Sequence, residues 1–360
     1  MRDLYLKVGI FYYFCIPEEA ITRALLTNQM LKKLIISGLA LTTACCSCSK
    51  STTSSADTGT GQATTTKAAS LPQFCADSAM LYVKQQLDFG PRVPGTEAQQ
   101  LCGTWLESEL VRHGANVKVQ HTEATSYEGK KLPVINIVGS YNPDAKMRVL
   151  LISHWDCRHV ADNDPDPAKR QQPVDGANDG ASGVGVLLEL ARLASQKQPL
   201  IGIDIFLTDV EDYGAPDDWK GSHDEKWWGM GTQLWCKQAV QEGYRAQYGI
   251  LLDMVGAPDA TFYREYYSDR YASTYVDQIW RTAADLGYKN LFINQRGGGI
   301  TDDHVFVNQI LGLPTVDIID TRMDSDGTFY PYWHTTGDTL DKLSAETMQK
   351  VGNLLVKLLW

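Results

Sequence analysis

The chain has 360 residues, of which 43% are hydrophobic, a composition that supplies one large core or two modest ones. Its formal net charge is −10, and no stripe of Lys and Arg follows the sequence. Because nucleic-acid binding depends on cationic side chains that neutralise phosphates, this composition argues against a nucleic-acid partner. No internal repeat occurs.

The N-terminal residues are typical of an export signal. From Met30 the sequence reads MLKKLIISGLALTTACCSCSK: two lysines, an apolar run too short to span a bilayer, then small residues. The Thr-Thr-Ala before Cys45 resembles the cleavage box of bacterial lipoproteins, which implies a lipoprotein-type signal at residues 30–45 and a lipid anchor on Cys45. An ordinary cleaved signal is the alternative. Residues 1–29 precede the signal and are interpreted as a mis-called start. We therefore expect an exported protein, periplasmic or membrane-anchored, of a Gram-negative-type bacterium.

Residues 46–70 are rich in Ser, Thr, Ala and Gly. Such a segment has too little apolar surface to offset its conformational entropy, so it is predicted to be a flexible tether. Residues 71–360 are then a single domain that carries all the catalytic candidates. Its cysteines are Cys75, Cys102, Cys157 and Cys236. They form no C-x-x-C or zinc-type spacing, and export would permit a Cys75–Cys102 bridge.

From residue 71 onward, apolar β-rich runs alternate with amphipathic stretches. Strands are predicted at residues 132–141, 148–155, 201–210, 248–256 and 313–320. Helices are predicted at residues 76–88, 96–113, 181–196, 230–242, 272–286, 303–311 and 345–359, the last with Ser344 as N-cap. Near-continuous Val, Ile and Leu in the middle three strands indicates burial on both faces. The alternation predicts a three-layer α/β sandwich with one mixed, mainly parallel central sheet flanked by helices.

Ionisable side chains gather where the predicted strands end, which is where ligands bind in such sheets. The strand at 148–155 ends with His154 and Asp156, which lie two apart and share one face. The segment FLTDVEDYG ends its strand with three carboxylates: Asp209, Glu211 and Asp212. Like charges so close repel one another, so the cluster predicts a cation among them or a catalytic base. Asp209 is interpreted as structural.

Three further segments complete this set. Asp253 lies on the strand at 248–256, Asp179 precedes a helix in PVDGANDGAS, and Trp333 and His334 follow the last strand. Each has a structural explanation when taken alone: Asp179 could cap its helix, Asp253 could pair with an arginine, and a histidine could belong to a polar rim. Together, two histidines and three or four carboxylates form the mixed N/O ligand set that suits Zn²⁺.

Other signals point away from competing chemistry. No G-x-S-x-G elbow occurs, so a serine hydrolase lacks its nucleophile turn. No G-x-G-x-x-G or Walker sequence opens a helix, so nucleotide use has no support. The loop ADNDPDP at residues 161–167 is interpreted as a solvated turn in preference to a calcium site. His159 and His223 are interpreted as non-ligands.

The order of the strand-end motifs resembles the signature of metallopeptidase family 28, which contains co-catalytic zinc aminopeptidases and the animal-type glutaminyl cyclases. The matching motifs span roughly residues 75–360: His154-x-Asp156, GANDGASG around Asp179, Glu211-Asp212, Asp253 and His334. The resemblance implies an α/β fold with one mixed central sheet. It also implies Asp179, Asp212 and His334 as primary zinc ligands, and Glu211 as the general base.

The same residues fit both branches of the family. In the two-metal aminopeptidases, the counterparts of His154 and Asp253 hold a second zinc that Asp179 bridges, and Asp156 is then a second-metal or outer residue. In the cyclases these positions bind no metal, and the counterpart of Asp253 joins a proton-handling network. All candidates are present, so counting ligands cannot separate the branches. One departure is Asp212, where many relatives have Glu.

Further features favour the cyclase branch. GGGITDDHVF resembles a cyclase segment, which makes Asp302 the third carboxylate of a network with Glu211 and Asp253. Trp333 before His334 resembles the cyclase pair in which the indole walls a small pocket, and SHWDCR is similar to bacterial cyclase relatives. An aromatic set of Trp219, Trp227 and Trp228 follows the base, and we expect Trp228 to border the pocket. The alternatives are a helix cap for Asp302 and core packing for the tryptophans.

We therefore expect a zinc-dependent glutaminyl cyclase that acts on peptides or exported proteins with N-terminal Gln and holds one zinc per chain. The alternative enzyme is a zinc aminopeptidase with two co-catalytic metals. A non-catalytic binding lipoprotein on a degenerate peptidase scaffold is the third hypothesis. Such a protein would have lost the base or a ligand, whereas all of them are intact here.

Overall fold

The computed structural model describes residues 70–322 and 328–360. The expected signal, the lipid-anchor candidate Cys45 and the tether up to residue 69 lie outside these residues. Backbone contacts gather these described residues into one compact unit. Within the described ranges, no helix has the length and apolar character that crossing a membrane requires.

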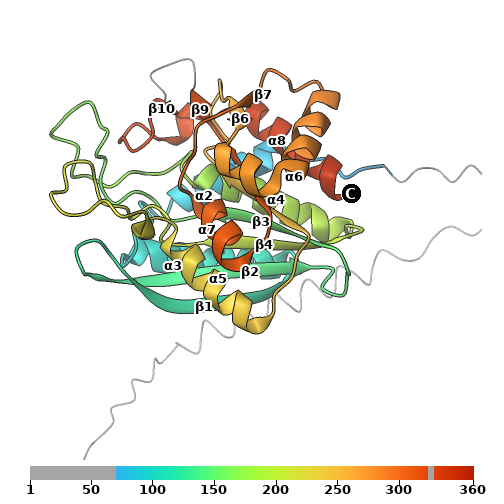
Figure 1. Cartoon of the computed structure of the whole chain (residues 1–360), viewed down its shortest axis with the longest axis horizontal. Coiled ribbons are helices and arrows are strands. Elements are labelled where there is room, and N and C mark those ends of the chain that lie inside the picture. The colour runs from blue at the N-terminus through green and yellow to red at the C-terminus, as the bar shows by residue number, and fades with distance from the viewer. Residues whose placement is uncertain (1–69, 323–327) are drawn as a thin grey trace, which may run out of the picture. The chain divides into compact units, whose positions relative to one another are not determined.

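A six-stranded mixed sheet forms the centre of this unit (Figure 1). Its strands are β1 (Asn116–Thr125), β2 (Lys131–Tyr141), β3 (Arg148–His154), β4 (Gly202–Thr208), β5 (Tyr248–Asp253) and β8 (Thr315–Ile319). Their order across the sheet is β1-β2-β4-β3-β5-β8. β4, β3, β5 and β8 are parallel, whereas β1 and β2 are a hairpin whose inner strand runs antiparallel to β4. The carboxyl ends of the four parallel strands therefore meet at one edge.

Helices cover both faces of the sheet. The main helices are α2 (Ala76–Leu87), α3 (Glu97–Arg112), α4 (Ala181–Gln196), α5 (Met230–Glu242), α6 (Tyr266–Asp285), α7 (Asp303–Phe306) and α8 (Ala345–Leu359). One face packs against α2, α3, α4, α6 and α8, and the other against α5 and the π-helical turn that follows α7. Two small ribbons complete the fold, β6 (Phe262–Arg264) with β7 (Phe292–Arg296), and β9 (Thr321–Arg322) with β10 (Thr328–Phe329).

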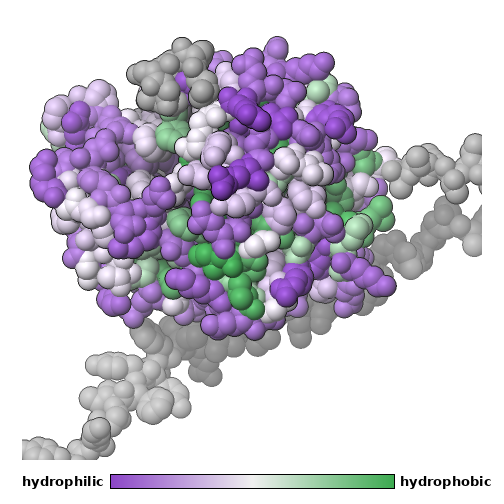
Figure 2. Space-filling view, viewed as in Figure 1, coloured by the Kyte–Doolittle hydropathy of each residue, from purple (hydrophilic) through white to green (hydrophobic). Residues whose placement is uncertain are grey.

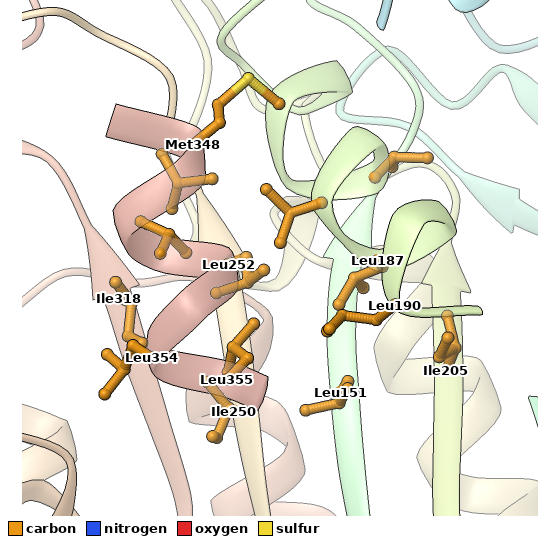
Figure 3. Close-up of a cluster of buried hydrophobic side chains, with 14 of the residues drawn as sticks. Leu151, Leu187, Leu190, Ile205, Ile250, Leu252, Ile318, Met348, Leu354 and Leu355 are labelled. Atoms are coloured by element: carbon orange, nitrogen blue, oxygen red, sulfur yellow. The ribbon is translucent and has the colours of Figure 1, made fainter. Parts of the chain in front are cut away.

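Alternate residues of each central strand supply the two halves of the core, because successive side chains of a strand point to opposite faces. Leu151 lies in the larger half with residues of α4 and α8, and Figure 3 shows Leu187, Leu354 and Leu355 packing there. Leu150 faces the smaller half beneath α5. The face of the molecule shown in Figure 2 is mostly hydrophilic, with an apolar patch where α5 meets the turn after α7.

The predicted architecture and all five predicted strands are confirmed, and Ser344 caps α8 by accepting the Thr347 N–H at 3.3 Å. Several local predictions were wrong. β1 was missed because its polar sequence NVKVQHTEAT belongs to a half-exposed edge strand. α6 begins six residues before the predicted start at residue 272, where non-helical φ and ψ angles kink it. The stretch 303–311 is a short α-helix followed by a π-helical turn.

The cysteines of the described chain are all free thiols, so the Cys75–Cys102 bridge does not form. Cys102 is buried in the core from α3, whereas Cys75 is the half-buried N-cap position of α2.

Candidate metal centre

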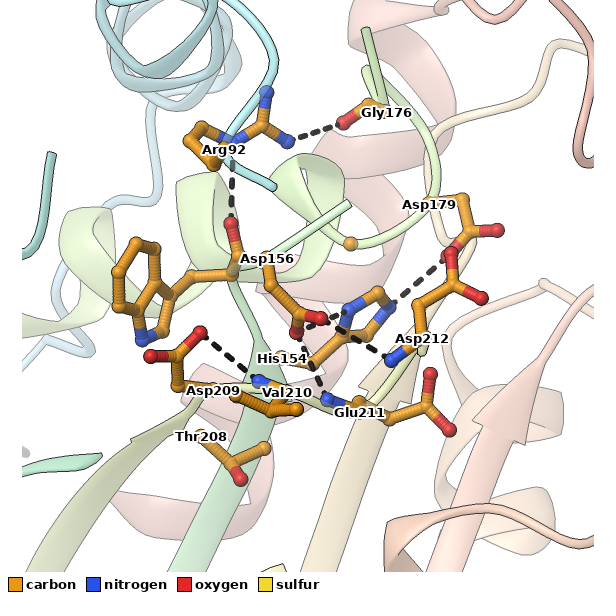
Figure 4. A network of polar contacts seen from close by, with 12 residues as sticks. Arg92, His154, Asp156, Gly176, Asp179, Thr208, Asp209, Val210, Glu211 and Asp212 are labelled. Carbon is orange, nitrogen blue, oxygen red and sulfur yellow. Dashed lines mark hydrogen bonds and ion pairs between the residues drawn. The ribbon is translucent and has the colours of Figure 1, made fainter. Parts of the chain in front are cut away.

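The candidate residues converge at the edge where the parallel strands end (Figure 4). β3 ends at His154, whose register partner on β4 is Thr208, and β5 ends at Asp253. Asp179 precedes α4, and the N-terminus of this helix lies against the end of β3. Gly180 permits that approach, because a Cβ atom there would lie 2.5 Å from His154 Nε2.

Asp179, Asp212 and His334 form the first candidate ligand group. One potential ligand atom from each lies within 4.8 Å of the others, and all three residues are buried. His334 Nε2 is 3.1 Å from Asp212 Oδ1 and 3.7 Å from Asp179 Oδ2. Neither carboxylate oxygen of Asp212 has a hydrogen-bond partner, although both are buried. Two carboxylates and an imidazole with orphaned oxygens fit a Zn²⁺ ion.

A second group shares Asp179 and adds His154 and Asp253. His154 Nε2 lies 3.0 Å from Asp179 Oδ1 and 3.2 Å from Asp253 Oδ1. Asp179 thus offers one oxygen to each group, the arrangement that a bridging carboxylate requires. The geometry is therefore compatible with one ion or with two.

Asp156 belongs to neither group and instead holds the loop after β4. Its Oδ1 accepts the Glu211 N–H at 3.0 Å, and its Oδ2 accepts the Asp212 N–H at 3.1 Å. It also lies 3.5 Å from His154 Nδ1. Asp156 therefore occupies the outer position of the two that the sequence left open for it.

Asp338 holds the loop that carries Asp179 in the same way. Its buried carboxylate accepts the N–H groups of Asn178 and Asp179 at 2.9 and 3.1 Å. Burial and the neighbouring Asp179 raise the pKa of Asp338 to about 8. The sequence analysis missed this residue, and its position four residues after His334 in HTTGD was the available signal.

Glu211 has the electrostatics of a buried base. It is 7% exposed, and burial raises its pKa well above the usual range, with the Asp302 carboxylate adding to the rise. Burial also raises the pKa of Asp253 to about 7, and Asp179 contributes to that shift. Burial likewise raises the pKa of Asp302, which is the N-cap of α7 and accepts the Asp303 N–H. Asp302 thus fills the capping role and is an electrostatic neighbour of the base.

Three residues at the site have left-handed backbone conformations that L-residues rarely adopt. Val210 precedes Glu211 with φ of 54°, Met254 follows Asp253 with φ of 48°, and His334 itself has φ of 55°. A β-branched residue such as Val is a clear outlier in this region. Such strain persists where the surrounding fold over-determines the backbone, and it clusters at functional sites.

Aromatic rings border His334. Trp333 stacks on it with ring centroids 3.8 Å apart, and Trp228 lies nearly parallel to it at 6.2 Å. Trp219 and Trp227 instead contact Tyr127, at 4.9 and 6.3 Å. Of the three tryptophans that follow the base, the structure therefore brings the predicted Trp228 to the site.

The other polar candidates are structural. Asp209 is fully buried and accepts hydrogen bonds from Gln99 Nε2 and from the Ile135 N–H. His159 stacks on Tyr213 at 3.9 Å, and burial together with Arg158 lowers its pKa to about 3. Neither His159 nor the exposed His223 belongs to a metal-competent group within the described ranges.

The prediction of a solvated turn at residues 161–167 was wrong for two of its aspartates. Asp162 pairs with Arg158 and lies 3.4 Å from His334 Nδ1. Asp164 is 3% exposed and accepts the N–H and the hydroxyl of Thr336 at 2.9 and 2.6 Å. Both aspartates therefore anchor the loop that carries His334.

Sequence reasoning also missed buried groups behind the site. Arg92 donates to the carbonyls of Trp155 and Gly176 at 3.0 and 2.9 Å, which secures the loop before Asp179 (Figure 4). His304 bonds Glu265 at 2.9 Å, and it forms a third group of potential ligands with Asp302 and Asp317. No motif marks the contacts of Arg92 or the His304–Glu265 bond, because each joins residues far apart in the sequence.

Residues 136–359 match peptidase family M28. The crystal structure of Tannerella forsythia glutaminyl cyclase is 48% identical with a TM-score of 0.77, over 80% of this chain and 98% of that one. A Zn-dependent exopeptidase from Parabacteroides distasonis is 47% identical with a TM-score of 0.78, over 80% and 99% of the two chains.

Curated relatives are more distant. The glutaminyl-peptide cyclotransferase of Drosophila melanogaster is 25% identical over 314 residues, which are 78% of this chain and 80% of that protein. Aminopeptidase YwaD of Bacillus subtilis is 27% identical over 188 residues, and the match spans 36% of its length.

Proposed function

The chain belongs to peptidase family M28, and we propose that it is a zinc-dependent glutaminyl-peptide cyclotransferase, which converts the N-terminal Gln of peptides to pyroglutamate and releases ammonia. The observation that carries the proposal is a deeply buried Glu211 beside a ligand group of two aspartates and a histidine. Similarity to bacterial glutaminyl cyclases over nearly their full length supports it.

The reaction needs one base and no outside nucleophile. The α-amine of the substrate attacks the carbon of its own side-chain amide, a C–N bond forms to close the ring, and the bond to the amide nitrogen breaks. Glu211 takes a proton from the attacking amine and delivers it to the departing nitrogen, which leaves as ammonia. Asp179, Asp212 and His334 would hold a zinc ion, which would supply a Lewis acid to polarise the amide carbonyl.

The surroundings of Glu211 suit both halves of this proton transfer. A base that must also act as an acid works best when its pKa lies near the working pH. Burial, the Asp302 carboxylate and the Asp212 carboxylate raise the pKa of Glu211. Asp253 and Asp302 are the further members of the proposed carboxylate network.

Trp333 and Trp228 are proposed to wall the substrate pocket. Their rings flank His334, so a substrate near the ligand group would lie against apolar surface. Excluding water there favours attack by the substrate's own amine over hydrolysis.

A zinc aminopeptidase is the second candidate, and one observation favours it. The group of His154, Asp179 and Asp253 could hold a second ion, and the Parabacteroides distasonis relative is a Zn-dependent exopeptidase. We propose a single zinc per chain, because the similarity to bacterial glutaminyl cyclases favours the cyclase branch, in which Asp253 belongs to the proton network and not to a second metal site.

The substrate assay separates the two activities. The domain from about Ala69, loaded with zinc, is incubated with peptides that begin with Gln or with Leu. The proposal predicts ammonia from the Gln peptide alone, with the peptide bond intact. Free amino acid from either peptide would assign the chain to the aminopeptidases.

We also propose that the chain is exported and anchored through a lipid on Cys45. The support is the signal-like sequence from Met30 onward. Expression in a Gram-negative host should place the full chain in the membrane fraction, and Cys45→Ala should prevent lipid attachment. Lipid labelling that survives this substitution would contradict the anchor.

A further inference from the structure

Arg158 is a buried cation at the centre of the candidate site. It lies four residues beyond the end of β3, and its side chain is 1% exposed. A buried guanidinium requires partners for its N–H groups. Those partners are the loop that carries Asp212, a proposed zinc ligand, and Asp162, which in turn contacts the proposed ligand His334.

The first partner is the loop that contains Asp212. Nη1 of Arg158 donates to the carbonyl oxygens of Asp212 and Gly214 at 3.3 and 2.9 Å, and it lies 3.6 Å from Asp212 Oδ1. Asp156, two residues before Arg158, accepts the N–H groups of Glu211 and Asp212. Asp156 therefore holds this loop through its backbone N–H groups, and Arg158 holds it through its backbone carbonyl groups.

The second partner is Asp162, which links the guanidinium to His334. The other edge of the guanidinium forms a two-point pair with Asp162, with Nε 3.2 Å from Oδ1 and Nη2 2.7 Å from Oδ2. Asp162 Oδ1 in turn lies 3.4 Å from His334 Nδ1. A carboxylate at Nδ1 keeps the proton on that nitrogen, which leaves the lone pair of Nε2 facing Asp212 and Asp179.

The face of the guanidinium has a third contact. It lies 5.0 Å from the ring of Trp228, which is nearly parallel to the His334 ring. Gly214 makes room for this indole, since a Cβ atom there would lie 2.2 Å from it. Arg158 thus contacts the Asp212 loop, Asp162 and a proposed wall of the substrate pocket, and Asp162 extends this set to His334.

We propose that Arg158 and Asp162 are positioning residues that set the zinc affinity of the centre, Arg158 by holding the Asp212 loop and Asp162 by orienting His334. This proposal rests on the proposed zinc centre but not on which substrate is turned over. Lysine cannot replace Arg158, because a single ammonium cannot supply the fork to Asp162 and the two carbonyl contacts together. The aspartate at 212 is shorter than glutamate, so the position of its backbone determines how far its carboxylate reaches.

The test is competition for zinc between the purified domain and a chromophoric chelator, for the parent, Asp162→Asn and Arg158→Lys. Loss of an outer partner of a metal ligand typically weakens metal affinity about 10- to 100-fold, and we expect a loss of that size in both variants. The double variant should lose less than the product of the single losses, because both act on one linked set.

Arg148→Lys is the matched control. Arg148 forms an equally two-pronged pair with Asp204 at the opposite end of β3, far from the ligands. We expect this variant to bind zinc within about threefold of the parent. Thermal melting of the zinc-free proteins checks folding, and Asp162→Asn alone decides the question if Arg158→Lys does not fold. Parent-like affinity in a folded Asp162→Asn would overturn the proposal.

Because the readout is zinc binding, it is independent of the substrate assay. Weakened zinc binding in a protein that proves to be an aminopeptidase would uphold this inference and reject the proposed reaction. Parent-like zinc binding by the Arg158 and Asp162 variants, in a protein that proves to be a cyclase, would reject this inference and uphold the proposed reaction.

Discussion

Asp204 and Asp212 are two aspartates on one segment, each 1% exposed, at opposite ends of the sheet. Asp204, on β4, accepts hydrogen bonds from four donor atoms of Arg148, Ser140 and Tyr244, at 2.5 to 2.9 Å. Asp212, four residues after β4 ends, has no hydrogen-bond partner for either oxygen. At one end the chain supplies four hydrogen bonds to a buried carboxylate, and at the other it supplies only two nearby cationic side chains, His334 at 3.1 Å and Arg158 at 3.6 Å.

The difference separates a structural charge from a functional one. A buried carboxylate whose oxygens accept no hydrogen bond destabilises a fold. A chain therefore retains such a carboxylate where a bound cation can compensate its charge. The other features of that edge agree: several raised carboxyl pKa values, and left-handed φ angles beside Glu211 and Asp253. Substitutions at the Asp212 end and at the Asp204 end of the sheet should therefore have different effects.

The largest effect is expected from the base. Glu211→Gln preserves size and removes the group that moves the proton, so turnover of a Gln peptide should fall by about 10²- to 10⁴-fold. Zinc content should stay at the parent level, because Glu211 is not in the ligand group. Ammonia release and elemental analysis of the same sample measure both. Turnover close to that of the parent would reject Glu211 as the base.

Asp212→Asn should weaken zinc binding by at least ~100-fold, beyond the usual effect of an outer partner. Without zinc, the variant should lose less stability than Asp204→Asn, because Asp212 accepts no hydrogen bond. Its two cationic neighbours, His334 and Arg158, both keep Asp162 as a partner. Chelator competition and urea unfolding of the zinc-free protein test the two statements. A large loss of zinc-free stability would mean that Asp212 has a structural role.

Asp204→Asn should give the opposite pattern. It leaves Arg148 in a largely buried position without its anion, which we expect to lower the free energy of unfolding by about 3 kcal/mol. Zinc affinity should remain within about twofold of the parent, because the pair lies at the far end of β3 and β4. Reduced zinc affinity would show that the two ends are not independent.

The stability of the zinc-free protein should depend on pH because of buried groups at the candidate metal centre. Burial raises the pKa of Asp253 to about 7 and of Asp338 to about 8. Burial opposes the charged form of His334, but Asp212 and Asp162 raise its pKa to about 9. Groups whose folded pKa exceeds the unfolded value bind more protons in the folded state, and their stabilisation is lost as pH rises through the folded pKa.

From about pH 6.5, the ordinary histidine value, to pH 9, zinc-free protein should therefore become less stable, by up to about 1.4 kcal/mol per pH unit for each titrating group. Below this window, the lowered pKa of the buried His159 acts in the opposite direction. Bound zinc should widen the gap between loaded and zinc-free protein as pH rises, because its ligands must lose their protons. Thermal melts across the window test this, and a flat or rising zinc-free curve would contradict it.

The smallest effect is expected at the pocket wall. Trp333→Phe keeps an aromatic ring against His334 but reduces the apolar surface, so we expect KM for a Gln peptide to rise a fewfold with little change in kcat. Trp219→Phe is the control, since its ring contacts Tyr127. Equal effects of the two substitutions would remove Trp333 from the pocket.

Much of the fold and part of the site were predictable from the sequence. The central strands are continuous apolar runs, and their ends carry the charged residues His154, Glu211 and Asp253, so the alternating pattern indicated where these would meet. β1 escaped because an edge strand that is polar and half exposed has no such run.

The supporting contacts could not be predicted, for a physical reason. Arg158 ends the segment SHWDCR and Asp162 lies in ADNDPDP, but neither segment shows that its side chain is a partner of His334, which lies more than 170 residues later in the sequence. The backbone conformations of Val210 and Met254 are imposed by packing against the preferences of their residue types.

Locating the bound zinc is the most direct test of which residues ligate it. Crystals of the zinc-loaded domain, measured at the zinc absorption edge, would locate each ion by anomalous scattering. The account predicts one peak per chain, ligated by Asp179, Asp212 and His334, beside Glu211. A second peak ligated by His154 and Asp253 would contradict the single-zinc cyclase, and a peak away from Asp212 would contradict the whole assignment.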